Sequence, residues 1–344
     1  MFPKATLVAA ALAFASTVAA APGLRISVSA PASVNGVQDL KLSTTLTNTG
    51  DEILRVLNDP ESILDDLDTD TFSITSSSGS HPSFTGAVTK YSPEAAAADG
   101  GFTILNVGES ITVEHDLAST YDFTDAGADD YTFVPHNRFQ IVKDDGSIED
   151  LVADFEETTA KVEGVLAVER RAIEKRAEFP GCTAARSSLI TTAYGVAATY
   201  ATNAKDYLAA NTGATQRYTT WFGAANASRR STVVSHFQKI SAGNFASYTY
   251  DCSCTRSGVY AYVYSNQPGK MWLCPVFWQI ANSGTDSKAG TIVHEASHWS
   301  VNGGTSDYVY GQSGAKSLAT SNPGQAVMNA DNHEYFVENT PNLP

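Results

Sequence analysis

The C-terminal half of this chain is organised around TIVHEASHWSVNGGTSDYVYG, residues 291–311. If the first part of this stretch is helical, His294 and His298 lie one turn apart on the same face, with about 5–6 Å between their side-chain roots. Two imidazole nitrogens at that spacing can bind one zinc ion, each at about 2.0–2.1 Å. Glu295 lies beside that face, where its carboxylate can take a proton from a metal-bound water instead of binding the metal.

The residues around this motif favour a buried helix that presents a metal site. Asp286 or Thr285 can cap the helix at its N-terminus, and Gly303-Gly304 ends it soon after the second histidine. Its packed side is apolar and consists of Ala289, Ile292, Val293 and Ala296. The alternative is an amphipathic core helix whose two histidines bind no metal.

A catalytic zinc site needs a third protein ligand and a fourth position left open for water. The metzincin pattern places a glycine three residues after the second histidine and a third histidine three residues further on, but Val301 and Gly304 stand at those positions. The nearest remaining candidate is Asp307, just past a Gly-Gly turn that can fold the chain back under the helix. The alternative for Asp307 is an ordinary loop carboxylate.

The segment Gly304–Gly311, GTSDYVYG, matches the G-T-x-D-x-x-Y-G signature that accompanies H-E-x-x-H in the aspzincins, the deuterolysin-like fungal metalloendopeptidases. The chain resembles this family over its whole C-terminal half, and is most similar to the peptidyl-Lys metalloendopeptidase branch. The resemblance implies Glu295 as catalytic base and the Tyr310 hydroxyl as a group that stabilises the oxyanion. It also implies one Zn²⁺ whose ligands are His294, His298 and Asp307.

The four cysteines all lie in the C-terminal half, and disulfides are expected in a secreted chain. Cys252 and Cys254 on one strand would point the same way and are poorly placed to bridge each other. Two pairings then remain: Cys182–Cys252 with Cys254–Cys274, or Cys182–Cys254 with Cys252–Cys274. The resemblance to the aspzincins implies the first. A Cys-x-Cys metal site is the competing interpretation.

Near the C-terminus, residues 325–339 (QAVMNADNHEYFVEN) are predicted to form a helix with an apolar face of Val327, Met328, Tyr335 and Phe336. Asp331 and Glu334 share one flank of it, where a capping-box-like pair or a solvated face is the plain interpretation. The family resemblance instead implies that this helix supplies an acidic pocket for the side chain just after the scissile bond. Two carboxylates around one ammonium favour lysine, whereas a guanidinium needs more room and a different geometry.

The N-terminus has the pattern of a secretory signal peptide in residues 1–20: Lys4, an apolar run over residues 5–15, and a small-residue cleavage site at Val18-Ala19-Ala20. A lone N-terminal anchor is the alternative. No run reaches the about 18 apolar residues of a membrane span. We expect a soluble, secreted, extracellular monomer that binds neither nucleic acid nor membrane. Asn226 begins the one glycosylation sequon, a weak signal.

Two dibasic pairs, Arg170-Arg171 and Lys175-Arg176, separate halves of different charge. Residues 21–176 contain 28 acidic and 11 basic side chains, whereas residues 177–344 contain 9 and 10. In a secreted chain such pairs are typical of processing sites for a kexin-type protease. We therefore divide the chain into a signal peptide (1–20), an acidic propeptide (21–176) and a catalytic domain (177–344). Our hypothesis is that the propeptide assists folding and keeps the protease inactive.

The N-terminal half shows alternating apolar runs between turn residues, which predict a β-sandwich-like domain with strands at 24–28, 40–46, 72–75, 110–113 and 131–134. The acidic run 65–70 lacks the glycine and closing glutamate of a calcium-binding loop, so we expect a solvated face. Residues 148–174 turn helical and charged, which predicts an exposed linker. The histidines of this half, His81, His115 and His136, show no ligand spacing.

The C-terminal half is predicted to be mainly helical, with a small antiparallel sheet, which makes the whole chain α+β and the catalytic domain zincin-like. Helices are expected at 187–210, 215–222, 227–240 and 312–320, and strands at 247–251, 259–264 and 271–273. In zincin folds an edge strand pairs with the extended backbone of the substrate. The pattern does not indicate which strand does so here. His236 and His333 are expected not to be ligands.

Together these features predict a secreted zinc endopeptidase that cleaves protein and peptide substrates on the N-terminal side of lysine. Two alternatives remain open. One is a deuterolysin-type zinc endopeptidase of broad specificity. The other is a non-catalytic secreted binding module whose zinc is structural, in which case a chelator would unfold the domain rather than only silence it.

Overall fold

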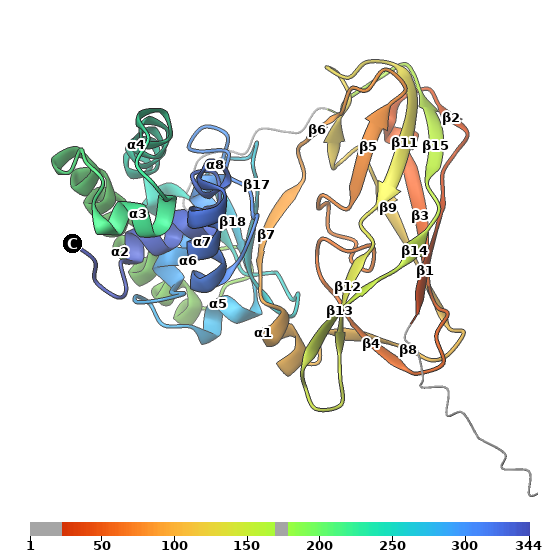
Figure 1. Ribbon diagram of the computed structural model, residues 1–344, viewed down its shortest axis with the longest axis horizontal. Helices are drawn as coiled ribbons and strands as arrows, with labels where there is room; N and C mark the ends of the chain where they lie inside the picture. The colour runs from red at the N-terminus through yellow and green to blue at the C-terminus, as the bar shows by residue number, and fades with distance from the viewer. Residues whose placement is uncertain (1–22, 169–177) are drawn as a thin grey trace, which may run out of the picture.

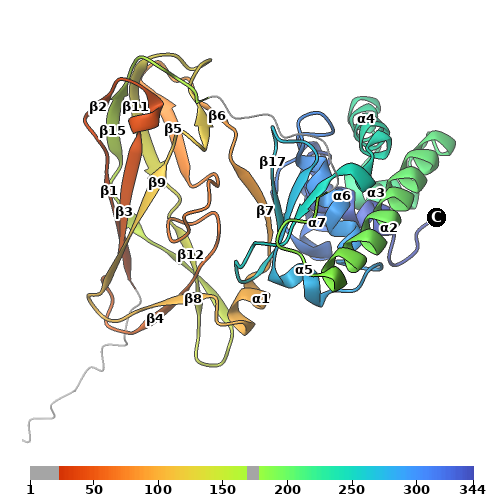
Figure 2. The ribbon, with the colours of Figure 1, turned by 180° about the vertical axis from the view of Figure 1, so that it is seen from behind.

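The computed structural model describes residues 23–168 and 178–344. A β-rich N-terminal half lies beside a mainly helical C-terminal half, so the predicted α+β class is confirmed (Figures 1 and 2). The expected signal peptide and both dibasic pairs fall outside the described residues. Among the helices within the described ranges, none is long and apolar enough to cross a membrane.

Three four-stranded sheets and a two-stranded ribbon build the N-terminal half. In spatial order the first sheet is β14 (Asp154–Phe155), β1 (Leu24–Ser29), β3 (Lys41–Asn48) and β9 (Ser110–Asp116). The second is β2 (Ser33–Val34), β15 (Thr158–Val162), β11 (Asp129–Pro135) and β5 (Phe72–Ser76). The third is β13 (Ile148–Val152), β12 (Arg138–Val142), β4 (Leu54–Leu57) and β8 (Phe102–Leu105). The ribbon pairs β10 (Tyr121–Asp122) with β6 (Ser83–Phe84).

All five strands predicted in this half are present, as β1, β3, β5, β9 and β11. The predicted helical linker is wrong, because residues 148–162 form β13, β14 and β15. In β15 only Ala160 and Val162 are buried, and Lys161 between them is exposed. The many charged residues of these strands lie on their exposed sides, and that density of charge produced the helical pattern.

Two short helical segments complete the N-terminal half, the 3-10 turn η1 (Val37–Asp39) and helix α1 (Pro93–Ala98). The C-terminal half contains α2 (Ala184–Ala210), α3 (Gln216–Phe222), α4 (Ala227–Ala242), η2 (Phe245–Ser247), α5 (Pro275–Gln279), α6 (Lys288–His298), α7 (Gly311–Ser321), α8 (Pro323–Ala326) and α9 (Ala330–Glu338). The predicted helices are therefore present. The last one begins at Ala330 instead of Gln325, because Asn322 caps the separate short helix α8.

Helix α6 lies at the centre of the C-terminal half, in contact with α2, α9 and β17 (Val259–Tyr264). The α2 side of this packing is a stripe of small residues at three- and four-residue spacing, which allows a close approach of the two helices. The buried residues of α2 are Ile190, Ala193, Ala197, Ala201, Ala204 and Leu208. Every residue of α6 is buried. The site is thus carried on a helix that is fixed on all sides.

The sheet of the C-terminal half includes a strand from the other half. Its order is β16 (Thr249–Asp251), β18 (Lys270–Leu273), β17 and β7 (Ala87–Tyr91). The predicted antiparallel sheet needs correction, since β16 runs parallel to β18 while β17 runs antiparallel to both of its neighbours. In both ribbon views β7 leaves the N-terminal sheets and runs along β17 (Figures 1 and 2).

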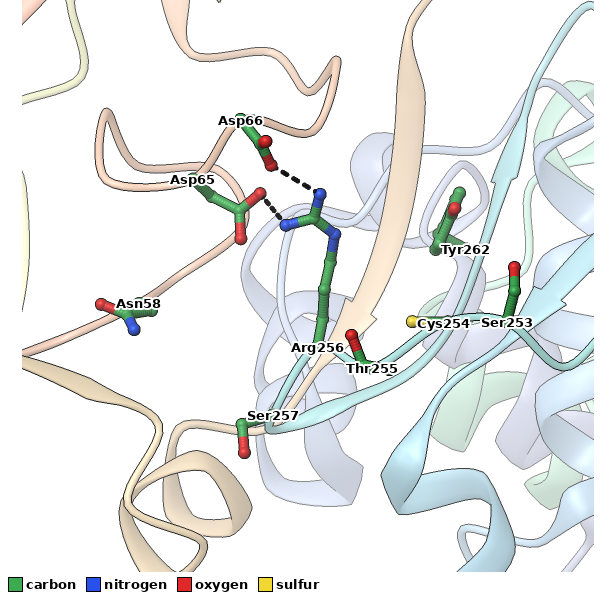
Figure 3. Close-up of a pocket in the computed structure, with 9 residues that line it drawn as sticks. All are labelled: Asn58, Asp65, Asp66, Ser253, Cys254, Thr255, Arg256, Ser257 and Tyr262. Carbon is green, nitrogen blue, oxygen red and sulfur yellow. Dashed lines mark hydrogen bonds and ion pairs between the residues drawn. The ribbon is translucent and has the colours of Figure 1, made fainter.

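A second contact between the halves is an ion-pair cluster around Arg256. Its guanidinium pairs with Asp65 and with Asp66, the latter at 2.8 Å, and all three residues line a cavity of about 550 Å³ (Figure 3). The expectation of a solvated acidic face over residues 65–70 is therefore wrong for Asp65, which is buried against a cation of the other half, whereas Asp66 pairs with the same cation and stays exposed.

The four cysteines form the disulfides Cys182–Cys252 and Cys254–Cys274, as the family resemblance implied. The first ties the segment before α2 to the end of β16. The second joins the loop before β17 to the start of α5. Both bridges therefore brace the sheet that borders the site.

Candidate metal centre and substrate pocket

Helix α6 begins at the residue after Ser287, whose hydroxyl accepts a hydrogen bond from the backbone N–H of Gly290 at 3.0 Å. The predicted cap at Asp286 or Thr285 is therefore off by one or two residues. Asp286 instead has a φ of 50°, in the left-handed region that directs the chain into the helix. Glu338 of α9 accepts hydrogen bonds from Ser287 N and Oγ, so α9 fixes the start of α6.

The turn after α6 brings Asp307 back to the helix. The helix ends at His298, and the N–H groups of Gly303 and Gly304 both donate to the carbonyl of Trp299. Gly304 has a φ of +57°, and a Cβ on Gly303 would lie 2.9 Å from the carbonyl oxygen of Ser297. Glycine is thus required at position 304 by the positive φ and at position 303 by the close approach of the Ser297 carbonyl oxygen.

Three buried side chains converge where the sequence predicted a zinc site. His294 Nε2 lies 3.2 Å from Asp307 Oδ1, and His298 Nε2 lies 3.2 Å from Asp307 Oδ2. These ligand atoms all lie within 4.8 Å of one another, and no other His, Cys, Asp or Glu of the described residues belongs to this group. Both Nε2 atoms and both Asp307 oxygens are buried without a hydrogen-bond partner. Such atoms are costly to bury unless they bind a cation, so the residues fit a zinc ion.

The other ring nitrogens of the two histidines face oxygen atoms. His298 Nδ1 lies 2.8 Å from the carbonyl oxygen of Thr305, so it carries the proton and donates. His294 Nδ1 lies 2.9 Å from Asp331 Oδ1 and 3.2 Å from Glu334 Oε2. Both arrangements place the proton on Nδ1 and leave the Nε2 lone pair directed at the metal position.

Glu295 lies next to the ligands without joining them. Its side chain is fully buried and neither carboxylate oxygen has a hydrogen-bond partner. Burial raises the pKa of Glu295 to about 7, against the lowering effect of His294 and His298. A carboxylate with a pKa near neutrality can accept and return a proton.

An acidic pocket lies beside the metal position, and it already holds an ammonium group. Lys90 of β7 makes an ion pair and hydrogen bond with Glu334 and lies 3.6 Å from Asp331 Oδ1. A third carboxylate, Asp286, is 3.9 Å from the same nitrogen, and the ring of Tyr260 lies 4.9 Å from it. The two predicted pocket residues are brought together. The sequence did not indicate Asp286 or Tyr260, whose contribution depends on the turn before α6 and on β17.

Tyr310 directs its hydroxyl at the same region. The hydroxyl donates a hydrogen bond of 2.6 Å to the backbone carbonyl of Thr89 in β7. Burial raises the pKa of Tyr310 well above its ordinary value, so the phenol stays protonated and acts as a donor. Tyr308 is 46% exposed and takes no part in this arrangement.

The remaining histidines of this half form a separate pair. His236 Nδ1 lies 3.0 Å from His333 Nε2, and His333 Nδ1 lies 2.9 Å from the carbonyl oxygen of Asn329. These contacts engage Nδ1 of His236 and both ring nitrogens of His333. Neither histidine belongs to the group of His294, His298 and Asp307, and the expectation that neither is a ligand stays a prediction.

Comparison with protein-family models matches residues 207–338 to Aspzincin_M35, described as lysine-specific metallo-endopeptidase. Among known proteins, the chain is similar to the peptidyl-Lys metalloendopeptidase of Grifola frondosa, at 46% identity over 98% of each chain. It is similar to the enzyme of that name from Armillaria mellea, at 48% identity over 95% of each chain. An extracellular protease of Aeromonas hydrophila is 36% identical over 88% of this chain and 89% of its own.

Among solved structures, the chain matches a zinc peptidase from Grifola frondosa with a TM-score of 0.47 and 51% sequence identity. The match covers 47% of this chain and all of that one.

Proposed function

Because the chain belongs to the aspzincin family and is a zinc metalloendopeptidase, we propose that it hydrolyses peptide bonds on the N-terminal side of lysine. The observation that carries this proposal is the acidic pocket beside the metal position. Asp331 and Glu334 flank the ammonium group of Lys90 there, which supports a pocket whose charge suits a lysine side chain. Lysine suits it because three donors on one compact charge can meet several carboxylates.

The metal would be held by His294, His298 and Asp307, whose partnerless buried atoms fit it. When bound, zinc supplies a lowered pKa to a water molecule and polarises a carbonyl group.

Glu295 carries out the proton transfers: it takes a proton from the attacking water and passes it to the backbone nitrogen of the lysine, which leaves as the α-amino group. The hydroxyl of Tyr310 donates to the carbonyl oxygen as negative charge develops on it. Asp331 also faces His294 Nδ1, so it orients a ligand as well as a substrate.

We further propose that residues 1–20 are a signal peptide, that residues 21–176 are a propeptide, and that a kexin-type protease separates them from the catalytic domain 177–344. The net charge of −15 resides almost wholly in the N-terminal half, and the relative in Aeromonas hydrophila is named an extracellular protease. Secretion is the context in which two disulfides persist.

The first prediction tests the specificity. The processed enzyme, given a denatured protein and zinc, is expected to release peptides that begin with lysine, and the chelated enzyme to release none. Mass spectrometry of the peptides reads out both results. The double variant Asp331→Ala with Glu334→Ala should lose the preference for lysine over arginine, whereas Lys316→Ala on α7 should keep it. An unchanged lysine-to-arginine ratio in the double variant would end the pocket assignment.

The two alternatives predict different results. A deuterolysin-type enzyme of broad specificity would yield peptides with mixed first residues. If the zinc of a binding module is structural, a chelator should unfold the domain. Tryptophan fluorescence detects this unfolding, because all four tryptophans lie after residue 220. The carboxylate of Glu295 has no hydrogen-bond partner and lies beside the metal position, where it can act on a water molecule. This favours a catalytic zinc over a structural zinc whose four ligands all come from the protein.

A further inference from the structure

The strand β7 joins the C-terminal sheet in the way that an extended peptide binds an exposed sheet edge. It pairs antiparallel with β17, and the register places Thr89 opposite Tyr262 and Lys90 opposite Ala261. A register shift between Val259 and Ala261 leaves Tyr260 without a partner residue on β7. Addition of a strand to a sheet edge is a general mode of peptide recognition, with backbone hydrogen bonds for affinity and side-chain pockets for specificity.

Lys90 is the side chain of β7 that enters a specificity pocket. It is 3% exposed, and its ammonium lies among Glu334, Asp331 and Asp286. Burial alone would lower the pKa of Lys90, but these carboxylates outweigh it and hold the pKa well above its ordinary value. The lysine is therefore charged, and it neutralises carboxylates that would otherwise repel one another inside the protein.

The residue before Lys90 meets the second substrate-directed group. The carbonyl oxygen of Thr89 accepts the hydrogen bond from the Tyr310 hydroxyl. This carbonyl belongs to the Thr89–Lys90 peptide bond. Two groups assigned above to a substrate, the lysine pocket and the oxyanion-directed tyrosine, thus contact adjacent residues on either side of one bond in the chain itself.

We propose that β7 occupies the active-site cleft as a substrate mimic, with Lys90 in the place of the substrate lysine and the Thr89 carbonyl in the place of the scissile carbonyl. The inference rests on the proposed function, because the pocket and the tyrosine have their roles from it. It adds the means of inhibition: the N-terminal half closes the cleft with the side chain that the enzyme recognises. Any lysine-containing substrate must displace Lys90 before it binds.

The flanking structure holds β7 in this register. The N–H of Ser92 donates a hydrogen bond of 2.8 Å to the carbonyl of Gly258, directly before β17. Gly258 has a φ of +76°, and a Cβ on it would lie 2.5 Å from the Ala96 Cβ of α1. The two halves therefore approach closely beside the strand pair, which fixes where β7 starts and ends along β17.

The test uses the full chain loaded with zinc and carrying Glu295→Gln, so that it cannot digest itself. Hydrogen exchange is measured over residues 87–91 and 259–264, and binding of a labelled peptide with one lysine is followed by fluorescence anisotropy. The parent should protect both segments and bind the peptide weakly. Adding Lys90→Met, which keeps an apolar stem, should raise exchange in both segments and tighten peptide binding by about tenfold or more, since a hydrogen bond to a charged group contributes roughly that factor.

Lys143→Met is the matched control, because this lysine pairs with Glu52 and Glu149 within the N-terminal half only. It should leave exchange and peptide binding at the parent values. Circular dichroism verifies the fold of each variant, and Lys90→Arg serves as a second test should Lys90→Met fold poorly. Lys90→Arg keeps the charge but changes its geometry, so it should loosen β7 to a smaller extent.

The proposal is overturned if Lys90→Met and Lys90→Arg both leave the exchange of β7 and the binding of the peptide unchanged. Failure of the proposed function would look different. In that case the processed enzyme would show no preference for lysine, while loss of β7 protection in Lys90→Met would still show that this lysine holds the strand in the cleft.

Discussion

Asp331 contacts two N–H donors that belong to different parts of the site, the Nδ1 atom of His294 and the ammonium of Lys90. Its second oxygen accepts a hydrogen bond of 2.7 Å from the N–H of Gly311. Burial would raise the pKa of Asp331, but Lys90 and His294 lower it below its ordinary value, so the carboxylate is charged. One side chain therefore links the metal position to the lysine pocket.

This double role gives a prediction for Asp331→Asn. The amide cannot accept from His294 Nδ1–H as strongly as a carboxylate, so zinc affinity should fall by about 10–100-fold. Competition with a chelator measures it in the Glu295→Gln background. Asp286→Asn is the control, since Asp286 lies near Lys90 and has no contact with His294. Equal zinc affinity in the two variants would show that Asp331 serves the pocket alone.

The second prediction at this scale concerns Glu295→Gln. The variant keeps the shape of the side chain but cannot accept a proton, so the rate should fall by about 10²–10⁴-fold while bound zinc and thermal stability are retained. Elemental analysis for zinc and a melting curve accompany the activity measurement. Substantial turnover in a zinc-loaded variant would contradict the role of Glu295.

At the scale of residues, the sequence predicted the candidate site residues that lie close together in the chain. His294, Glu295, His298 and Asp307 lie within 14 consecutive residues, so one helix and one turn place them. Lys90 could not be predicted, because it lies 244 residues from Glu334 in the chain and resembles any other lysine in a short apolar run. No local pattern records a contact between distant segments.

At the scale of elements, α4 and α9 meet through two neutral histidines. Burial lowers the pKa of His236 to about 4 and that of His333 to about 3. Phe222 and Phe237 pack against the His333 ring, and Lys239 adds repulsion to a protonated His236. Both side chains are therefore ill suited to carry a positive charge in the folded protein.

This pair predicts acid destabilisation of the C-terminal half. The folded pKa values lie below the unfolded value of about 6.5, so the stabilisation is complete above that pH and is lost as the pH falls toward 4. Between pH 7 and pH 5 the loss should be about 2 kcal/mol for each histidine. Urea unfolding followed by tryptophan fluorescence measures it in the Glu295→Gln chain. In His236→Gln the loss should be smaller by about that amount, and an identical pH dependence would contradict the prediction.

The elements also show where pattern reasoning fails. Helix α2 and strand β17 were predicted because each alternates between a packed face and an open face with the period of its own secondary structure. Strand β7 has no such alternation, since four of its five residues are buried. The C-terminal half covers β7 on a side that would otherwise be exposed. The sequence of β7 alone does not indicate this contact.

At the scale of the whole molecule, several contacts among the described residues join the two halves. They include the β7–β17 pair, the Lys90 ion pairs, the Arg256 cluster, and an apolar cluster in which Leu57, Tyr91, Ala96 and Val142 meet Val259 and Cys274. None of these contacts depends on the segment 169–177 that contains the dibasic pairs. These contacts can therefore hold the two halves together without a continuous backbone between them.

This separation predicts the outcome of cutting after Arg176. The two fragments should still elute together in size-exclusion chromatography at micromolar concentration, and they should separate more readily when the chain carries Lys90→Met. Arg256→Ala should weaken the association to a smaller extent, because Arg256 and Asp66 are partly open to solvent. Fragments that separate at once in the parent chain would show that the linker alone holds the halves together.

The antiparallel seam between β7 and β17 also has a consequence for timing. While the backbone is continuous, β7 is held near β17 at an effective concentration of the order of millimolar. This effective concentration does not depend on how dilute the protein is. Once the backbone is cut, the pairing of β7 with β17 follows ordinary mass action. If β7 occupies the active-site cleft as proposed, dilution then favours its release and a high concentration of the two fragments favours its retention.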